Sequence, residues 1–268
     1  MKIILGNAPI KNGNRGCVAL TITIACMIDE IMKKAGLSYE LYLSDSQYDD
    51  RKTHEILIDD RKIEFKDCRY PIGISLKNTI GTIIKNIVKG SDLNIFFKAD
   101  YILDIGQGDS FSDIYGFTRF NSIDRIHRIA NFLHIPYCIL PQTIGPFKNY
   151  NVEHRAIKSI SNASYCMARD KQSYDYVVGK IPSLKSVKEY IDVAFFLPYH
   201  KIEQDTSFIH VGINISALLW HGGYTRNNQF ELKCNYKRLI IDIVDFFLGI
   251  ENVQVHLIPH VVGAERTI

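Results

Sequence analysis

Residues 101–120, YILDIGQGDSFSDIYGFTRF, decide the fold of this chain. The run Tyr101–Leu103 is apolar, as expected of a buried strand in a parallel sheet. The chain turns polar at Asp104, and the glycines of Gly106-Gln107-Gly108 allow a tight turn with a close backbone approach to a ligand. Ligands of open α/β sheets bind at the carboxyl ends of the strands, so this turn predicts a binding site.

Four small polar residues come directly after the glycines, namely Asp109, Ser110, Ser112 and Asp113. They predict either a site that hydrogen-bonds a polar ligand or a strand-to-helix loop whose side chains cap backbone groups. The glycines do not decide between these two interpretations, because a single Gly-x-Gly pattern is common.

The composition is that of a globular protein. The chain has 268 residues, of which 46% are hydrophobic, and this is enough for a sizeable core. Its net charge is only +3, from 32 basic and 29 acidic residues, so the charge predicts no nucleic-acid partner. The six cysteines lie far apart and form no Cys-x-x-Cys pair, so we expect reduced thiols and neither disulfides nor a zinc site.

Hydropathy argues against export and against membrane insertion. The first apolar run, Ile3–Leu5, is too short for a signal peptide. No stretch approaches the ~18 apolar residues that a transmembrane helix needs. We therefore expect a cytoplasmic protein with at most peripheral contact to the inner face of the cell membrane. The sequence does not indicate which oligomeric state the protein has.

Apolar runs of strand length alternate with helical patterns, which is typical of an α/β fold with a parallel sheet. The expected strands are residues 2–5, 39–43, 101–103, 137–140, 165–168, 188–194, 208–215 and 253–258. Helical patterns cover residues 20–34, 78–88, 152–161 and 236–248, and further helices are expected to begin at Asn121 and at Arg169. The charged region 44–70 fits a hairpin around Asp59 and Asp60. The polar stretch 198–206 is expected to link a first domain, 1–200, to a second, 207–268.

The loop after the first strand contains Gly13, Asn14, Arg15 and Gly16 and leads into a helix. A strand, a Gly/Asn loop and a helix in this order point free backbone N–H groups at an anion, and Asn14 and Arg15 add side-chain donors. The alternative is a plain loop with Arg15 on the surface.

Two later loops are expected at the same edge of the sheet. Arg169 lies where a strand ends and a helix begins, which suits a guanidinium that holds phosphate or carboxylate, although an ion pair with Asp170 or another acid would also explain it. Gln142 lies in the stiff loop 141–147, which contains two prolines and a glycine. That loop either presents polar groups to a ligand or is only a rigid connection.

Taken together, these motifs resemble the polysaccharide pyruvyl transferase family. The matching pieces are, in order, Gly13-Asn14-Arg15-Gly16, Asp104-Ile105-Gly106-x-Gly108-Asp109-Ser110-Phe111, Leu140-Pro141-Gln142-Thr143-Ile144-Gly145-Pro146-Phe147, Ala168-Arg169-Asp170, Asp192-Val193-Ala194-Phe195 and Val211-Gly212-Ile213-Asn214-Ile215-Ser216. No single piece is specific, but their order and spacing are, and the resemblance covers essentially the whole chain.

The resemblance implies two Rossmann-type domains that face each other across a cleft, as in GT-B glycosyltransferases. It also implies transfer of the enolpyruvyl unit of phosphoenolpyruvate onto two hydroxyls of a sugar, which gives a cyclic pyruvate ketal. The acceptor would be a sugar or a lipid-linked oligosaccharide of a bacterial surface polysaccharide, such as a capsule or an exopolysaccharide. Phosphoenolpyruvate would be the donor substrate, and neither a cofactor nor a metal is expected.

The same resemblance suggests a role for each candidate residue. The donor-binding residues would be Gly13, Asn14, Arg15, Gly16, Arg169 and Ser216, and the acceptor-binding residues Asp109, Ser110, Asp113 and Gln142. Arg169 would also belong to the catalytic set, with a histidine as the general acid, since histidine suits that role near neutral pH. His221 and His260 both follow second-domain strands, and His260 after Pro259 is preferred, unless both are solvated loop histidines.

The chain departs from the family in one respect, because it reaches Ile268 without the family's downstream Arg-x-His motif. We therefore expect an incomplete second domain, and either an inactive fragment or an acid supplied by another residue. Two other functions share these features. A GT-B glycosyltransferase that uses a nucleotide-sugar would have the same fold, and a truncated, non-catalytic protein that binds a glycan or an anion would retain the same loops.

Overall fold

The computed structural model describes residues 1–45, 53–58, 61–71, 81, 86, 91–201, 203, 205–223, 226–259 and 261. The chain forms two compact units. The first comprises Met1–Lys11 and Cys17–Pro198, and the second comprises Asn12–Gly16 and Tyr199–Ile268. The division after Pro198 falls at the start of the polar stretch interpreted above as a linker.

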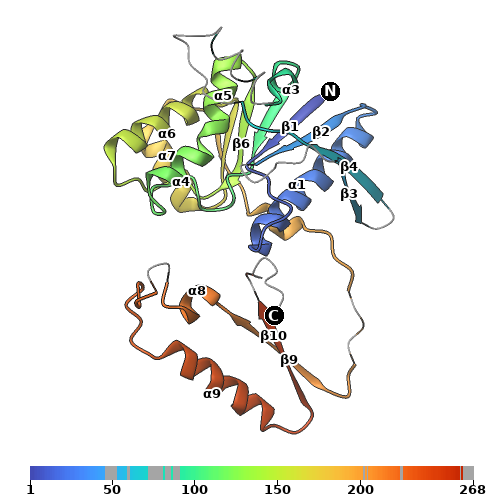
Figure 1. Ribbon diagram of the computed structural model, residues 1–268, viewed down its shortest axis with the longest axis vertical. Helices are drawn as coiled ribbons and strands as arrows, with labels where there is room; N and C mark the ends of the chain where they lie inside the picture. The colour runs from blue at the N-terminus through green and yellow to red at the C-terminus, as the bar shows by residue number, and fades with distance from the viewer. Residues whose placement is uncertain are drawn as a thin grey trace. The chain divides into compact units, whose positions relative to one another are not determined.

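The first unit contains an eight-stranded sheet with the strand order β3-β4-β2-β1-β5-β6-β7-β8 (Figure 1). The strands are β1 (Lys2–Gly6), β2 (Glu40–Ser44), β3 (Thr53–Ile58), β4 (Arg61–Asp67), β5 (Tyr101–Asp104), β6 (Tyr137–Gln142), β7 (Tyr165–Ala168) and β8 (Val187–Glu189). All neighbours are parallel except β3 and β4, which pair antiparallel. This confirms the predicted α/β class with a parallel sheet, and it confirms the hairpin, although Asp59 and Asp60 themselves lie outside the described residues.

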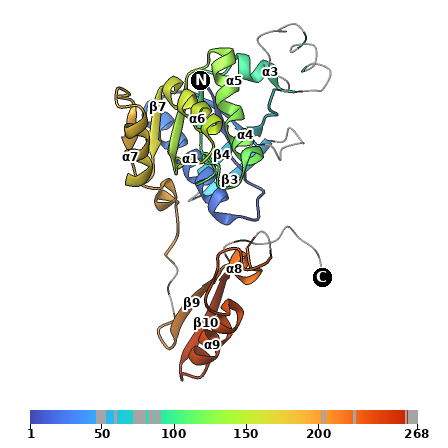
Figure 2. The same cartoon turned by 90° about the vertical axis from the view of Figure 1, so that its left-hand side faces the viewer.

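Helices cover both faces of this sheet. Residues on alternate positions of β1 enter different cores, since Ile3 and Leu5 pack with α1 (Arg15–Lys34), whereas Ile4 packs with the helices of the other face. That second layer consists of α5 (Arg125–Leu133), α6 (Tyr150–Asn162) and α7 (Lys171–Lys180). Figure 1 shows this layer and α1 on opposite sides of the sheet, and Figure 2 turns the layer toward the viewer. The buried stripe of α1, which includes Leu20, Ile24 and Ile28, follows the predicted helical spacing.

The helix predicted to begin at Asn121 is two helices, and that prediction is wrong. Helix α4 (Phe117–Ile123) begins after Gly116, and α5 follows directly after Asp124, so Asn121 lies inside α4. Asp124 makes no side-chain cap hydrogen bond, because its carboxylate is used by groups of the neighbouring helix instead. Four of the nine residues of α5 are buried, and one of them is His127, which the sequence pattern left outside the apolar stripe.

The remaining elements of the first unit are short. They are α3 (Leu93–Phe97) and the 3-10 helix η1 (Val193–Phe196). The short strand predicted within residues 188–194 is β8, which lies at the start of that run, because the chain turns into η1 after Asp192. The helix predicted at residues 78–88 lies almost entirely outside the described residues.

The second unit is a strand, helix, strand arrangement, as predicted. Strands β9 (Ile209–Ile215) and β10 (Val253–Pro259) form a two-stranded parallel sheet, with α8 (Ala217–Trp220) and α9 (Tyr236–Leu248) between them in sequence. Its buried apolar residues include Ile213 and Ile240. Across the ranges described above, no helix of either unit is long and apolar enough to span a bilayer.

Candidate active site at the carboxyl edge of the sheet

Asp104, at the end of β5, is the centre of a buried hydrogen-bond network. Its Oδ1 atom accepts from Asn7 Nδ2 at 2.6 Å and from the Gly106 backbone N–H at 3.1 Å. Its Oδ2 atom lies 2.9 Å from His127 Nε2 and accepts from Gln142 Nε2 at 3.2 Å. These partners follow β1, β5 and β6 or come from α5, so one carboxylate fixes three neighbouring strand ends and a helix.

The side chain of Gln142 lies directly against Gly106 of the glycine turn. Its side chain is fully buried, and a Cβ atom placed on Gly106 would lie only 1.4 Å from Gln142 Oε1. Gly106 also has a φ of +66°, in the left-handed region that disfavours L side chains. Since the Gln142 side chain does not reach the surface in this structure, we revise its predicted role from acceptor contact to positioning of Asp104 and Gly106.

Replacing Gly106 by alanine is expected to lower the free energy of unfolding by about 2–4 kcal/mol, because it adds a clash with Gln142 to the cost of a left-handed alanine. Gly36→Ala is the matched control, since Gly36 has a φ of +65° and no atom within 4 Å of its added Cβ. That control should cost about 1–2 kcal/mol. Urea unfolding of both variants measures the difference, and adding Gln142→Ala to Gly106→Ala should recover part of it. Equal losses at the two glycines would show that Gln142 does not constrain the turn.

The guanidinium of Arg119 contacts two residues at the glycine turn. Arg119, from α4, donates to Gln107 Oε1 and to Ser110 Oγ, the latter at 3.0 Å from Nη2 and 3.2 Å from Nε. Gln107 also donates to Asp45 Oδ1 at 3.4 Å. Ser110, predicted to bind the acceptor, is 3% exposed and holds Arg119 in place. Burial raises the pKa of the nearby Cys17 thiol, and the positive charge of Arg119 opposes only part of this shift.

Arg169 lies beside the same turn. Its Nη1 atom forms a 2.8 Å ion pair with Asp192 Oδ2, and its Nε donates to Thr143 Oγ1 at 2.9 Å. A Cβ atom on Gly108 would lie 3.3 Å from this Nη1, so the glycine admits the guanidinium. The side chain is 25% exposed, and its Nη2 atom has no hydrogen-bond partner within the described part of the chain. The ion pair that the sequence left open therefore exists, but with Asp192, because Asp170 caps α7 instead.

The two predicted acceptor carboxylates differ in their surroundings. Asp109 is partly exposed, and its Oδ2 accepts from the Tyr115 hydroxyl at 2.7 Å. Asp113 Oδ2 accepts from the backbone N–H groups of Lys148 and Asn149, at 2.8 Å and 2.7 Å. Asp113 therefore holds the loop after β6 through these two hydrogen bonds. Asp109 is the better placed of the two carboxylates to bind a ligand, because it is not used in this way.

The remaining predicted site residues belong to the second unit. Ser216 accepts from the Leu219 N–H at 3.2 Å and caps α8, and His221 directly follows that helix. His260 lies outside the described residues. The residues Gly13, Asn14, Arg15 and Gly16 pack with the second unit, where Asn14 Oδ1 accepts from the Gly16 N–H at 3.0 Å at the start of α1. Over the ranges that the structure describes, no group of three or more His, Cys, Asp or Glu side chains could hold a metal ion.

Sequence reasoning missed three residues of the edge. Asn7 was only part of a Gly/Asn loop, Arg119 lies inside a helix, and His127 lies outside the apolar stripe predicted for its helix. The sequence pattern gave no sign that His127 is buried. Nothing in the local pattern around Arg119 indicated its contacts with Gln107 and Ser110.

Three solved structures are similar to this chain at low identity. Sucrose-phosphate synthase from Thermosynechococcus elongatus is 11% identical, with a TM-score of 0.37, over 71% of this chain and 88% of that chain. The UDP complex of S. aureus MnaA is 10% identical, with a TM-score of 0.44, over 95% of this chain and 68% of that one. A UDP-N-acetylglucosamine 2-epimerase is 14% identical, with a TM-score of 0.46, over 96% and 67%. A search of curated proteins finds no match.

The sequence model of one family matches most of the chain. It covers residues 24–263, and this range includes the glycine turn, the loop after β6, Arg169 and Asp192, which the fold brings to one edge of the sheet. The loop Gly13–Gly16 lies before the matched range. On this match, the chain belongs to the polysaccharide pyruvyl transferase family.

Proposed function

We propose that the protein transfers the enolpyruvyl unit of phosphoenolpyruvate to two hydroxyls of a sugar, at the carboxyl edge of the first unit's sheet. Family membership supports pyruvyl transfer to a polysaccharide. The observation that carries the finer assignment is the position of Arg169, which is held by Asp192 and Thr143 beside the glycine turn, with one terminal nitrogen that has no partner among the described residues. Such a guanidinium suits a carboxylate or a phosphate, and phosphoenolpyruvate has both.

The chemistry requires a proton at one carbon and an oxygen nucleophile at the next. A general acid protonates the methylene carbon of the donor, and a sugar hydroxyl adds to the adjacent carbon and loses its own proton. A second hydroxyl of the same sugar then displaces phosphate from that carbon and closes the ketal ring, and its proton leaves with the phosphate as hydrogen phosphate. We assign the acid to His221 or His260 of the second unit, because histidine exchanges protons near neutral pH.

The acceptor is assigned to Asp109. Its carboxylate is partly exposed, it uses one oxygen for Tyr115, and it lies on the same turn as Gly108, against which Arg169 packs. Carboxylates accept hydrogen bonds from sugar hydroxyls well, whereas an anionic donor would be repelled. The proposal places the reaction in the cytoplasm, with a lipid-linked oligosaccharide at the inner face of the membrane as one acceptor.

Asp109→Asn is expected to raise the Michaelis constant for the acceptor about tenfold and to leave that for phosphoenolpyruvate nearly unchanged, because one charge-assisted hydrogen bond to a sugar hydroxyl is weakened. Initial rates with each substrate varied in turn separate the two constants. Asp175→Asn removes an exposed carboxylate of α7 and serves as the control, with both constants unchanged. An effect on the donor constant instead would move Asp109 to the donor side.

The function itself is tested with the purified protein, phosphoenolpyruvate and a panel of nitrophenyl and lipid-linked sugars. Phosphate release that depends on the sugar, together with a new ketal methyl signal in the proton NMR spectrum, is the expected result. Parallel reactions contain a nucleotide-sugar in place of phosphoenolpyruvate. Sugar transfer with release of nucleoside diphosphate, and no ketal from phosphoenolpyruvate, would replace the proposal with a glycosyltransferase activity.

A further inference from the structure

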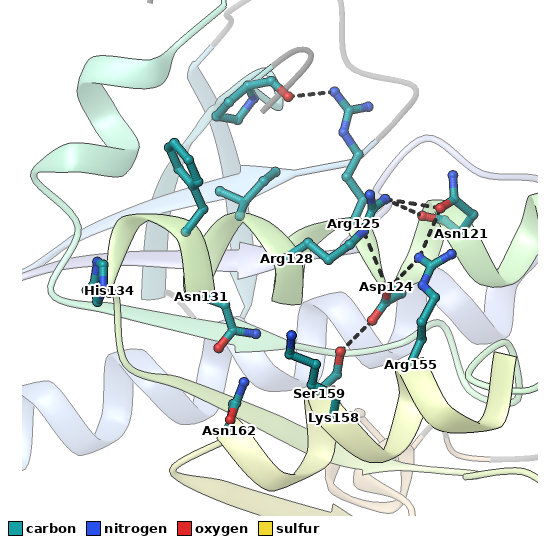
Figure 3. Close-up of a pocket in the computed structure, with 13 residues that line it drawn as sticks. Asn121, Asp124, Arg125, Arg128, Asn131, His134, Arg155, Lys158, Ser159 and Asn162 are labelled. Carbon is teal, nitrogen blue, oxygen red and sulfur yellow. Dashed lines mark hydrogen bonds and ion pairs between the residues drawn. The ribbon is translucent and has the colours of Figure 1, made fainter. Parts of the chain in front are cut away.

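A cavity of 810 Å³ lies in the helical layer of the first unit, between the α4–α5 segment and α6 (Figure 3). The residues that carry its chemistry are Asp124, Arg125, Arg128, Arg155 and Lys158. None of the residues at the carboxyl edge that we assign to donor or acceptor lines it. The volume is within the range of small-molecule binding sites in proteins.

The lining of this cavity is strongly cationic. Four of its side chains, Arg125, Arg128, Arg155 and Lys158, are cations, and Asp124 is the single acid among the lining residues that the structure describes. Asp124 is only 1% exposed and is already shared, since it accepts from Arg155 Nη2 at 2.8 Å and from Ser159 Oγ at 2.6 Å. Among the described lining residues, this one carboxylate pairs with Arg128 and Arg155, and it is the only acid beside the four cations.

Arg125 is held by neutral groups, whereas Arg128 and Arg155 share the Asp124 carboxylate. Arg125 donates to the Pro71 carbonyl oxygen at 2.8 Å and lies 4.9 Å from the centre of the Tyr70 ring, with no carboxylate partner in the described part of the chain. Arg128 donates to the Asn121 side-chain oxygen at 3.1 Å, and its Nε lies 3.4 Å from Asp124 Oδ2. Figure 3 shows Arg128 and Arg155 converging on Asn121 and Asp124.

The surroundings lower the pKa values of two of these arginines, Arg125 and Arg128. Burial lowers the pKa of Arg125, and the neighbouring Arg128 lowers it further. Burial also lowers the pKa of Arg128; the Asp124 carboxylate opposes that shift, and the charge of Arg155 adds to it. An anion in the cavity would supply the missing negative charge, because an opposite charge favours the protonated guanidinium. Arginine also holds phosphate oxygens in a bidentate fashion, which an ammonium group does not.

We propose that this cavity binds a phosphate or diphosphate group, with Arg125, Arg128, Arg155 and Lys158 as its ligands. The chemistry fits two sources, a free phosphate compound and the diphosphate of a membrane-borne carrier. Neither Arg169 nor Asp109 lines the cavity, so binding there can be tested separately from the proposed transfer reaction.

The test measures binding of inorganic diphosphate to the full chain by titration calorimetry, with chloride at matched ionic strength. We expect Arg125→Gln combined with Arg128→Gln to weaken binding at least tenfold, since two charge-assisted contacts to the anion are lost. Lys171→Gln and Arg238→Gln remove exposed cations elsewhere and should change the affinity less than about twofold. Lys158→Gln is a second variant of the cavity at an exposed position, and it tests the site if the double variant does not fold.

A second arm offers a polyprenyl diphosphate in detergent micelles, with micelles alone as the blank. Binding of both probes through the same arginines indicates a free phosphate compound, and binding of the lipid diphosphate alone indicates a membrane-borne carrier. Either result supports the site. Equal affinities of the wild type and the cavity variants for both probes, or no binding of either probe at about 10 mM, would overturn the proposal.

Discussion

Replacing His127 by leucine is expected to lower the free energy of unfolding by about 3–5 kcal/mol, because it leaves a buried carboxylate without its counter-charge. The His127 ring is fully buried between two aspartates. Its Nε2 lies 2.9 Å from Asp104 Oδ2, and its Nδ1 lies 3.5 Å from Asp124 Oδ1, which is an ion-pair distance and longer than a good hydrogen bond. Burial alone would lower the pKa of His127, but the charges and hydrogen bonds of the two carboxylates raise it to about 9.

The raised pKa gives this contribution a definite pH dependence. The imidazolium is favoured in the folded chain, whereas an unfolded histidine has a pKa of about 6.5. The stabilisation is therefore complete below about pH 6.5 and is lost as the pH rises from there through about 9. We expect the urea midpoint of the wild type to fall across this interval, and the midpoint of His127→Gln to start lower and to lack this part of the fall.

The difference between the two proteins is the quantity to measure. Burial raises the pKa of Cys166 to about 12 and also raises that of Cys68, so ionisation of these thiols in the unfolded chain destabilises both proteins alike at high pH. Parallel curves for wild type and variant would show that His127 is neutral in the folded protein. If the variants do not fold, the 15N shifts of the His127 ring in the wild type report the imidazolium directly at pH 8.

Replacing Arg169 by alanine is expected to weaken phosphoenolpyruvate binding roughly ten- to a hundredfold, because a charge-assisted contact of about 1.5–3 kcal/mol is lost. Arg169→Lys should be nearly as harmful. The guanidinium donates to Asp192 and to Thr143 and leaves a third nitrogen for the donor, a planar arrangement that an ammonium group cannot reproduce.

The measurement is the dissociation constant for phosphoenolpyruvate, with thermal unfolding as the check on the fold. Lys171→Ala removes an exposed cation of α7 that pairs with Asp175, and it should bind the donor like the wild type. Donor binding that is unchanged in both Arg169 variants, with the fold intact, would remove this residue from the site.

Local patterns in the sequence predict most of the first unit. Strands β1, β5 and β6 are apolar because both of their faces are covered by helices, and α1 repeats its apolar residues with helical spacing for the same reason. The glycines of the turn after β5 were also predictable, since a left-handed turn at the end of a strand favours glycine. The boundary between α4 and α5 was not, because Asp124 takes its partners, Arg155 and Ser159, from another helix.

The sequence by itself determined the α/β class, the order of the elements, the motifs of the family and the position of Arg169 at a strand end. Only the tertiary structure decided the partners of the polar residues. Asp104 meets Asn7 across 97 residues, and Arg169 meets Asp192 across 23. It also decided that Gln142 is buried and that four cations share one cavity with Asp124. The physical reason is that hydrophobic periodicity records only whether a residue is buried, whereas a hydrogen bond or an ion pair depends on which strand ends and helices the fold brings together.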